Sequence, residues 1–245
     1  MAGVSLSVTV LGCSGTYAGP DEACSGYLLR SDTTTVVVDL GAGTLANLQR
    51  HVALGDVDAV VLSHEHPDHW LDLPILRNAL RYVLDIEGLT VHGPAGVLAA
   101  ARELIGEVEP TFVLSPIAAG DALTVGDIAL GFSRTDHPVE TLAVRAESGG
   151  RSVIYSADTG PGWDPSGFGD GVDLFVCEAT FRPDEEGGVH LSARQAAGLA
   201  RRLGAGRLVI THVSPLLEDE GQRLAAAEAY GGTVELARSG RTFMA

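Results

Sequence analysis

The chain has 245 residues, of which 45% are hydrophobic and 20% are charged, so it carries enough apolar side chains for one buried core. No apolar run reaches the ~18–20 residues of a membrane-spanning helix, and the composition argues against both disorder and membrane spanning. The formal net charge is −16, with 32 acidic residues against 16 basic ones that are all Arg. Nucleic-acid binding depends on basic residues that displace counterions from phosphates, so this charge argues against a long nucleic acid as partner.

The first part of the chain alternates strands with turns and helices. Val4–Leu11 alternates apolar and polar residues, which is typical of a strand, and it ends in a Gly-Cys-Ser-Gly turn. Further strands are predicted at Gly26–Arg30, Thr35–Leu40, Asp58–Ser63 and Leu89–His92. Helices are predicted from Thr44 to about Ala53, from Asp68 to about Leu84 with a kink or an interruption at Pro74, and over Ala95–Ile105.

The middle of the chain is rich in strands, and its last part alternates strand with helix. The middle strands are separated by Gly and Asp turns, which is the pattern of a β-meander. They are predicted at Phe112–Pro116, Ala122–Val125, Ile128–Ser133, Leu142–Ala146 and Ser152–Tyr155. The later strands are predicted at Leu174–Cys177, Arg207–Ile210 and Thr233–Leu236, and the helices at Ser192–Leu203 and Leu217–Tyr230. No linker, charge block or repeat interrupts this pattern, so we expect one α/β domain over residues 1–245.

The cysteines indicate a reducing environment. There are three of them, at Cys13, Cys24 and Cys177, and no C-x-x-C pair is present. This argues against a disulfide framework and against a zinc ribbon. The amino-terminal residues also lack the basic segment and apolar core of a signal peptide. We therefore expect a cytoplasmic protein.

A dense cluster of histidines stands directly after the strand predicted at Asp58–Ser63. Residues 64–69 read His-Glu-His-Pro-Asp-His, although His makes up only 8 of the 245 residues. In an extended segment His64 and His66 point the same way and can reach one cation. The chain then turns at Pro67, so that Asp68 and His69 can serve a second cation. Glu65 faces away from the histidine pair, and Trp70 is expected to pack beneath the site.

Four ligands cannot complete two sites, and three suitable residues lie downstream, each just after a predicted strand. They are His137, Asp158 and His212. The carboxyl ends of strands are where α/β folds build their sites. We predict two divalent metal ions, with Zn²⁺ first and Mn²⁺ or Fe²⁺ as alternatives. Metal 1 is assigned to His64, His66 and His137, metal 2 to Asp68, His69 and His212, and Asp158 bridges the two.

With these residues the chain resembles the metallo-β-lactamase fold hydrolases from Val4 to about Leu236. The resemblance implies a four-layer αβ/βα sandwich with a dinuclear site at one edge of the β core. Many chemistries share this fold, so the fold alone does not decide the reaction.

A second set of segments is similar to the phosphodiesterase branch that contains ribonuclease Z. These segments are Cys177–Phe181, His190–Ser192 and Thr211–Pro215. The resemblance implies that His190 assists departure of the leaving group and that Glu178 orients it, and we place both in the catalytic group with Asp68. Three features depart from a tRNA nuclease: the short interval between His137 and Asp158, Leu216 where that branch has an Arg, and the acidic net charge.

The turn after the first strand, together with His137-Pro138 and the His190 segment, looks like the atypical class II cyclic-nucleotide phosphodiesterases of bacteria. This resemblance implies a metal-dependent hydrolase acting on a small phosphodiester, with 3′,5′-cyclic AMP as the expected substrate and attack by a metal-bound hydroxide. The alternatives are a ribonuclease Z-type endonuclease acting on tRNA 3′ ends, and a thioester, lactone or β-lactam hydrolase that uses the same ligands. No membrane partner is expected, and a homodimer is expected only because related enzymes are often homodimers.

Overall fold

The apolar strands of the chain pair into two β-sheets that pack face to face. The computed structural model describes residues 6–169, 171–182, 185, 188–217 and 219–245. In the described part of the chain each sheet has seven strands. The first sheet has the order β14 (Thr242–Met244), β1 (Ser7–Gly12), β2 (Gly26–Arg30), β3 (Thr35–Leu40), β4 (Ala59–Val61), β5 (Leu89–Gly93) and β6 (Phe112–Pro116). The second has the order β13 (Val234–Leu236), β12 (Ala205–Thr211), β11 (Val172–Glu178), β10 (Arg151–Tyr155), β9 (Leu142–Ser148), β8 (Ile128–Arg134) and β7 (Ala122–Val125).

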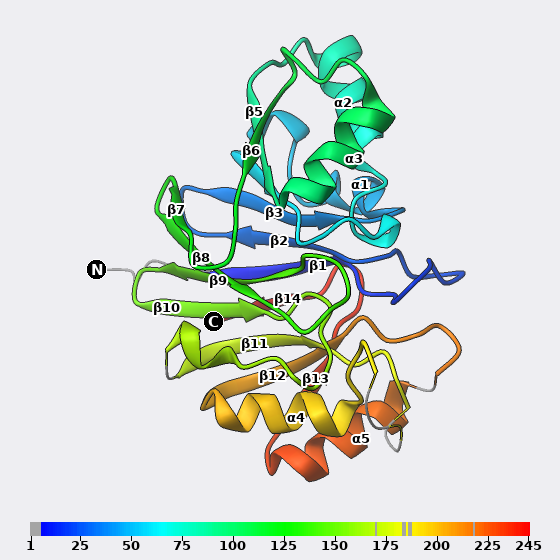
Figure 1. The fold of residues 1–245 in the computed structure, drawn as a ribbon, viewed down its shortest axis with the longest axis vertical. Coiled ribbons are helices and arrows are strands. Elements are labelled where there is room, and N and C mark those ends of the chain that lie inside the picture. The colour runs from blue at the N-terminus through cyan, green and yellow to red at the C-terminus, as the bar shows by residue number, and fades with distance from the viewer. Residues whose placement is uncertain (1–5, 170, 183–184, 186–187, 218) are drawn as a thin grey trace.

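Helices cover the outer face of each sheet, which gives four layers (Figure 1). The first sheet is covered by α1 (Thr44–Leu48), α2 (Leu73–Ala79) and α3 (Ala95–Ile105). The second is covered by α4 (Ala193–Arg202) and α5 (Asp219–Tyr230). Short helical turns lie at Leu54–Asp56, Pro67–His69, Leu80–Leu84 and Pro165–Phe168. The expected four-layer αβ/βα sandwich is confirmed.

Three apolar clusters follow from this layering. The central cluster lies between the sheets and includes Val8, Tyr27, Val144 and Tyr155. The two others lie between each sheet and its helices. Strands that face a core on both sides carry continuous apolar runs, such as Val36 to Val38 in β3, which is why these strands read so clearly from the sequence. Among the described helices, none has the length and apolarity needed to cross a membrane.

Some element boundaries differ from those expected. The helix predicted from Asp68 to about Leu84 is wrong as a single element, because a 3₁₀ turn at Pro67–His69 precedes α2 and a π turn at Leu80–Leu84 follows it. Pro74 lies in the first turn of α2, where its missing N–H costs no hydrogen bond, so it starts the helix and does not kink it. Helix α1 is shorter than expected. Strand β14 was not predicted, and Val4 of the first predicted strand lies outside the described residues.

Candidate metal centre

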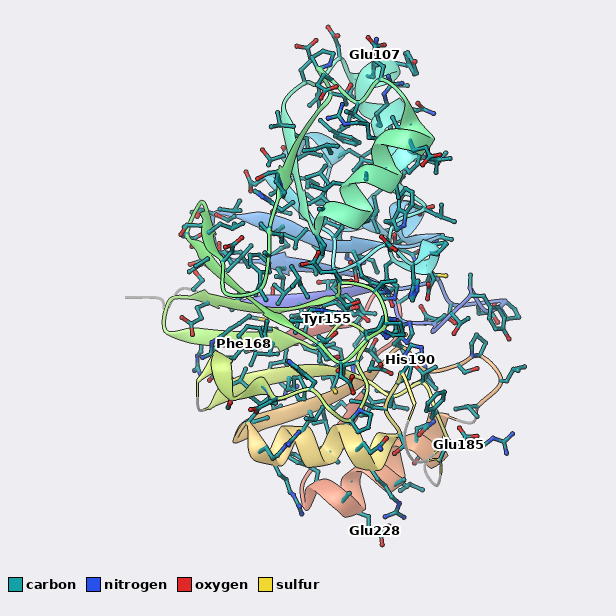
Figure 2. The ribbon with its side chains drawn as sticks, in the orientation of Figure 1. Glu107, Tyr155, Phe168, Glu185, His190 and Glu228 are labelled. Carbon is teal, nitrogen blue, oxygen red and sulfur yellow. The ribbon has the colours of Figure 1, made fainter. Side chains whose placement is uncertain are left out.

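The carboxyl ends of parallel strands from both sheets meet at one edge of the sandwich. Strands β3, β4 and β5 run parallel in the first sheet, and β10, β11 and β12 run parallel in the second. The loops after β4, β10 and β12 carry His64, Asp158 and His212 to this edge. His190, in the loop before α4, lies at the same edge (Figure 2). The predicted site residues therefore come from distant parts of the chain to one place.

One cluster of four side chains contains His64, His66, His137 and Asp158. Each offers one nitrogen or oxygen atom, and these atoms all lie within 4.8 Å of one another. His66 Nδ1 and His137 Nε2 are 3.2 Å apart. His64, His137 and Asp158 are buried, while His66 is partly exposed. These are the residues assigned to metal 1, together with the bridging carboxylate.

A second cluster contains Asp68, His69 and His212, whose ligand atoms also lie within 4.8 Å of one another. His212 Nε2 is 3.3 Å from Asp68 Oδ2 and 3.3 Å from His69 Nε2. The backbone N–H of Thr16 donates to Asp68 Oδ2 at 2.9 Å, which fixes that carboxylate from the outside. These are the residues assigned to metal 2.

Asp158 lies between the two clusters and presents one oxygen to each. Its Oδ2 is 3.6 Å from His64 Nε2 and 4.0 Å from His137 Nε2. Its Oδ1 is 3.2 Å from His69 Nε2 and 3.4 Å from His212 Nε2. This is the arrangement expected of a carboxylate that bridges two cations.

The donor set fits divalent cations. His64 Nε2 is buried without a hydrogen-bond partner, and so is Asp158 Oδ1. Buried polar atoms are normally satisfied, so each unpaired atom needs an explanation such as an ion. Buried carboxylates also require compensating positive charge. Imidazole nitrogens and carboxylate oxygens are ligands that Zn²⁺ and similar ions accept, so this His/Asp cluster is suitable for divalent metal ions.

Asp39, at the end of β3, supports both clusters from behind. Its carboxylate accepts hydrogen bonds from the Ser63 backbone N–H at 2.7 Å, from the Ser63 hydroxyl at 2.8 Å and from the Tyr155 hydroxyl at 3.0 Å. It also lies 2.7 Å from His69 Nδ1, which leaves His69 Nε2 facing the cluster. Ser63 Oγ lies 3.0 Å from His64 Nδ1 in the same way. Such partners fix the orientation of metal-binding histidines.

Asp39 is a residue of this site that the sequence pattern does not predict. The signal in the sequence is a lone carboxylate in an apolar strand, two residues before Gly41. Asp39 is fully buried and has a positive φ of 57°. Ala157 and His212 also have positive φ, at 51° each. Backbone strain of this kind gathers at functional sites, where the surrounding structure holds it in place.

The proton affinities of the clustered histidines diverge. Burial lowers the pKa of His64 well below its usual value, and the neighbouring His69 lowers it further. Burial acts the same way on His69, but the Asp158 and Asp39 carboxylates outweigh it and raise the pKa of His69 well above its usual value. The carboxylates therefore favour positive charge on His69, whereas burial disfavours it on His64.

A third group joins Glu178 to His190. Glu178 is fully buried at the end of β11, and its Oε1 accepts a hydrogen bond from the Thr159 backbone N–H at 2.7 Å. His190 Nδ1 is 3.0 Å from the same oxygen. Burial lowers the pKa of His190, but the hydrogen bond and charge of Glu178 outweigh this and raise it. His190 stacks on His212 with ring centroids 5.5 Å apart. The Glu178–His190 pair therefore borders the two clusters of predicted ligands, which together form the metal-ligand cluster.

The residues inside the histidine motif are also anchored. Trp70 is buried and its Nε1–H donates to the Glu65 carbonyl at 2.9 Å, as expected for packing beneath the site. The Glu65 carboxylate lies against the first turn of α3, where a Cβ on Gly96 would come 2.2 Å from Glu65 Oε2. A carboxylate at a helix amino terminus is favoured by the helix dipole, so this position of Glu65 is electrostatically favourable.

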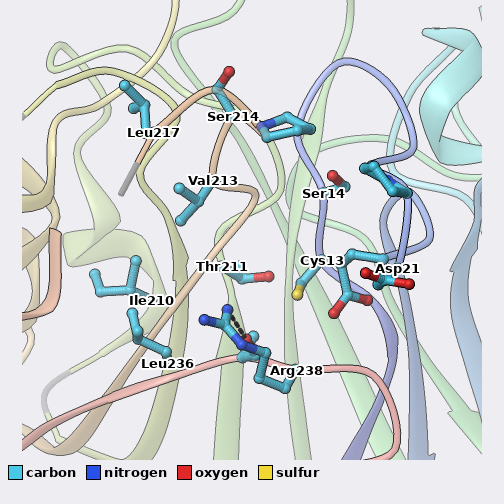
Figure 3. Close-up of a pocket in the computed structure, with 15 residues that line it drawn as sticks. Cys13, Ser14, Asp21, Ile210, Thr211, Val213, Ser214, Leu217, Leu236 and Arg238 are labelled. Carbon is cyan, nitrogen blue, oxygen red and sulfur yellow. Dashed lines mark hydrogen bonds between the residues drawn. The ribbon is translucent and has the colours of Figure 1, made fainter. Parts of the chain in front are cut away.

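A cavity of about 300 Å³ is lined by residues on either side of His212, among them Thr211 and Val213 (Figure 3). Its walls come from the loops after β1 and after β12, and its floor comes from the segment after β13. Ser14 and Val213 pair across the two walls, and the loops then continue to Thr16 and His212 at the metal-ligand cluster. The cavity contains none of the seven predicted metal ligands.

Comparison with known proteins identifies the family of this chain. The beta-lactamase superfamily domain matches residues 34–213, which is most of the chain. The chain belongs to the beta-lactamase superfamily. The match spans all seven predicted metal ligands.

Relatives within this superfamily cover nearly the whole chain. "Probable metallo-hydrolase YhfI" of Bacillus subtilis is 31% identical over 96% of this chain and 98% of its own. The crystal structure of the metallo-beta-lactamase fold protein YhfI matches with a TM-score of 0.91, covering 99% of this chain and 100% of YhfI. Rv1339 of Mycobacterium tuberculosis is 35% identical, with coverage of 98% and 92%. Ribonuclease Z of Mycobacterium bovis is 29% identical, with coverage of 94% and 95%. This superfamily member is therefore a hydrolase with the metallo-β-lactamase fold.

Proposed function

We propose that the protein is a metal-dependent phosphodiesterase that hydrolyses a small phosphodiester, with 3′,5′-cyclic AMP as the first candidate substrate. The observation that carries this proposal is the pair of buried Glu178 and partly exposed His190 beside the metal-ligand cluster. Hydrolysis of a phosphodiester expels an alkoxide, and this leaving group needs a proton. A thioester, by contrast, expels a thiolate, which is a good leaving group without a proton.

The metal centre of the proposal holds two divalent ions, Zn²⁺ in the first instance. His64, His66 and His137 would hold one ion, Asp68, His69 and His212 the other, and Asp158 would contact both. Ions bound there would lower the pKa of water for attack and neutralise charge on the phosphoryl oxygens. Local positive charge of this kind allows an acidic protein to bind a small anionic ester.

His190 is the catalytic residue of the leaving-group side. Its Nδ1 is committed to Glu178, so its Nε2 is free to give a proton to the departing oxygen. Glu178 is a positioning residue, because it fixes the ring and raises the pKa of His190, which favours the charged, proton-carrying form. Asp68, the partly exposed carboxylate of the second cluster, is the third residue that we place in the catalytic group with His190 and Glu178.

The size of the site region favours a small substrate over a folded RNA. Between His137 and Asp158 the chain forms the hairpin of β9 and β10 and no projecting arm. Leu216, where the ribonuclease Z branch has an Arg, is 82% exposed and offers no positive charge. The relative named ribonuclease Z supports RNA as the second candidate substrate, and the test includes it. A homodimer and a cytoplasmic location remain predictions.

The test is a hydrolysis panel with the zinc-reconstituted protein. The panel contains cyclic AMP, bis-p-nitrophenyl phosphate, pre-tRNA, a lactone and nitrocefin. We expect kcat/KM on the phosphodiesters to exceed that on nitrocefin and the lactone by orders of magnitude. Cleavage of pre-tRNA without cleavage of cyclic AMP would show that the substrate is RNA and not a small phosphodiester. Comparable kcat/KM for nitrocefin and bis-p-nitrophenyl phosphate would contradict the phosphodiesterase assignment.

The role of His190 is tested by its substrate dependence. His190→Ala should lower kcat for cyclic AMP by about 10²–10⁴-fold, the usual contribution of general acid catalysis. The loss on bis-p-nitrophenyl phosphate should be far smaller, because nitrophenolate leaves without a proton. Glu178→Gln should show the same bias more weakly. His51→Ala is the matched control, since His51 lies outside the cluster, after α1.

Equal losses on both substrates would indicate a binding or structural role for His190. Loss of metal in His190→Ala would instead make His190 an eighth ligand. The second result deserves a direct measurement, because Asp158, His190 and His212 also offer atoms within 4.8 Å of one another.

A further inference from the structure

The hydroxyl of Thr180 lies between the two halves of the proposed machinery. Thr180 lies two residues after the last residue of β11 and is buried. Its Oγ1 is 2.7 Å from His212 Nδ1 and 2.9 Å from Glu178 Oε2. It is also 3.0 Å from the His212 carbonyl oxygen. One hydroxyl therefore touches a predicted metal ligand and the carboxylate that orients His190.

The hydrogen-bond directions follow from the groups around Glu178. Its Oε2 accepts from the backbone N–H of Thr180 and of Leu191, each at 3.3 Å, and its Oε1 accepts from the Thr159 N–H. A carboxylate whose two oxygens both face N–H donors acts as an acceptor on both. The Thr180 hydroxyl therefore donates to Glu178 Oε2, since a hydrogen bond to a charged acceptor is stronger than one to a carbonyl.

The remaining lone pairs of Thr180 Oγ1 then accept from His212 Nδ1. His212 Nε2 faces Asp68, His69 and Asp158 at 3.3–3.4 Å. A neutral imidazole that presents an unprotonated Nε2 to a cation must carry its proton on Nδ1. The donors and acceptors are thus consistent in each hydrogen bond of the series: His212 donates to Thr180, and Thr180 donates to Glu178. His190 donates to the other carboxylate oxygen of Glu178.

We infer that Thr180 is a positioning residue that sets the tautomer and ring orientation of His212 and couples it, through Glu178, to His190. This inference rests on the metal centre proposed above and is independent of the substrate. Partners of metal-binding histidines typically contribute 10–100-fold to metal affinity. The hydroxyl should therefore matter to the binding of one ion, that held by His212, and much less to the other.

The experiment titrates metal-free protein with Zn²⁺ against a chromophoric chelator. Wild type should bind two ions. Thr180→Val, which keeps the shape and removes the hydroxyl, should weaken one of them by about 10–100-fold. Thr180→Ser, which keeps the hydroxyl, should stay close to wild type. Thr111→Val is the matched control, because the Thr111 hydroxyl at the foot of β6 is buried without a hydrogen-bond partner.

Unchanged affinity for both ions in Thr180→Val would overturn the inference, and so would a wild-type protein that binds fewer than two ions. Should Thr180→Val fail to fold, ¹⁵N spectra of histidine-labelled, zinc-bound wild type decide the matter. They should show His212 protonated at Nδ1, and protonation at Nε2 would overturn the inference. A wild type that binds two ions but cleaves no phosphodiester would refute the proposed substrate class alone.

Discussion

At the scale of single residues, Asp158 is the side chain on which both clusters depend. Because each of its oxygens faces a different cluster, Asp158→Ala should weaken the binding of both ions together. Elemental analysis after dialysis should find fewer than two ions per chain. The control is Asp56→Ala, since Asp56 is exposed and lies outside the clusters. An Asp158→Ala protein that still holds two ions would refute the bridging assignment.

The candidate metal-ligand positions could be chosen from the sequence because their signal is local. Residue type and spacing single out residues 64–69, and a position just after a strand singles out His137, Asp158 and His212. The structure brings all of these together. Asp39 and Thr180 carry no such spacing, since their roles come from contacts with Ser63, His69 and His212 that only the folded chain creates.

At the scale of elements, the capping box at the start of α4 holds the segment that follows His190. The Ser192 hydroxyl accepts from the Gln195 backbone N–H, and the Gln195 side chain accepts from the Ser192 N–H at 2.8 Å. Ser192→Ala should lower the free energy of unfolding by about 0.5–2 kcal/mol. Urea denaturation of the metal-free protein measures this without a contribution from ions. Ser192→Thr should lose much less, and a wild-type midpoint for Ser192→Ala would show that the cap is dispensable.

The elements that the sequence predicted poorly are those whose limits depend on packing. Strand β14 has only three residues and exists by pairing with the edge of β1. The region after the histidine motif breaks into a 3₁₀ turn, α2 and a π turn. Its apolar periodicity reads as one helix, but the motif must turn at Pro67 to bring Asp68 and His69 to the cluster. The long apolar strands, by contrast, were predicted within a few residues.

At the scale of the whole molecule, the net charge of −16 predicts an unusual salt dependence. Proteins that bind nucleic acid bind more tightly as salt is lowered, because they release counterions from phosphates. The affinity of this protein for a labelled single-stranded RNA should not rise when the salt concentration is lowered from about 200 to about 50 mM. Fluorescence anisotropy measures this directly. A steep rise in affinity at low salt would favour RNA as the substrate, and cyclic AMP hydrolysis in the same buffers is the control.

The two clusters also join the two sheets of the sandwich. His64, His66, Asp68 and His69 extend from the first sheet, whereas His137, Asp158 and His212 extend from the second. Ions held between them would act as cross-links that exist only in the folded chain, and each would add about 2.7 kcal/mol at a free concentration of 100 Kd. Metal supply would then govern how long the folded molecule lasts, and a starved cell would lose the enzyme by unfolding and proteolysis as well as by inactivation.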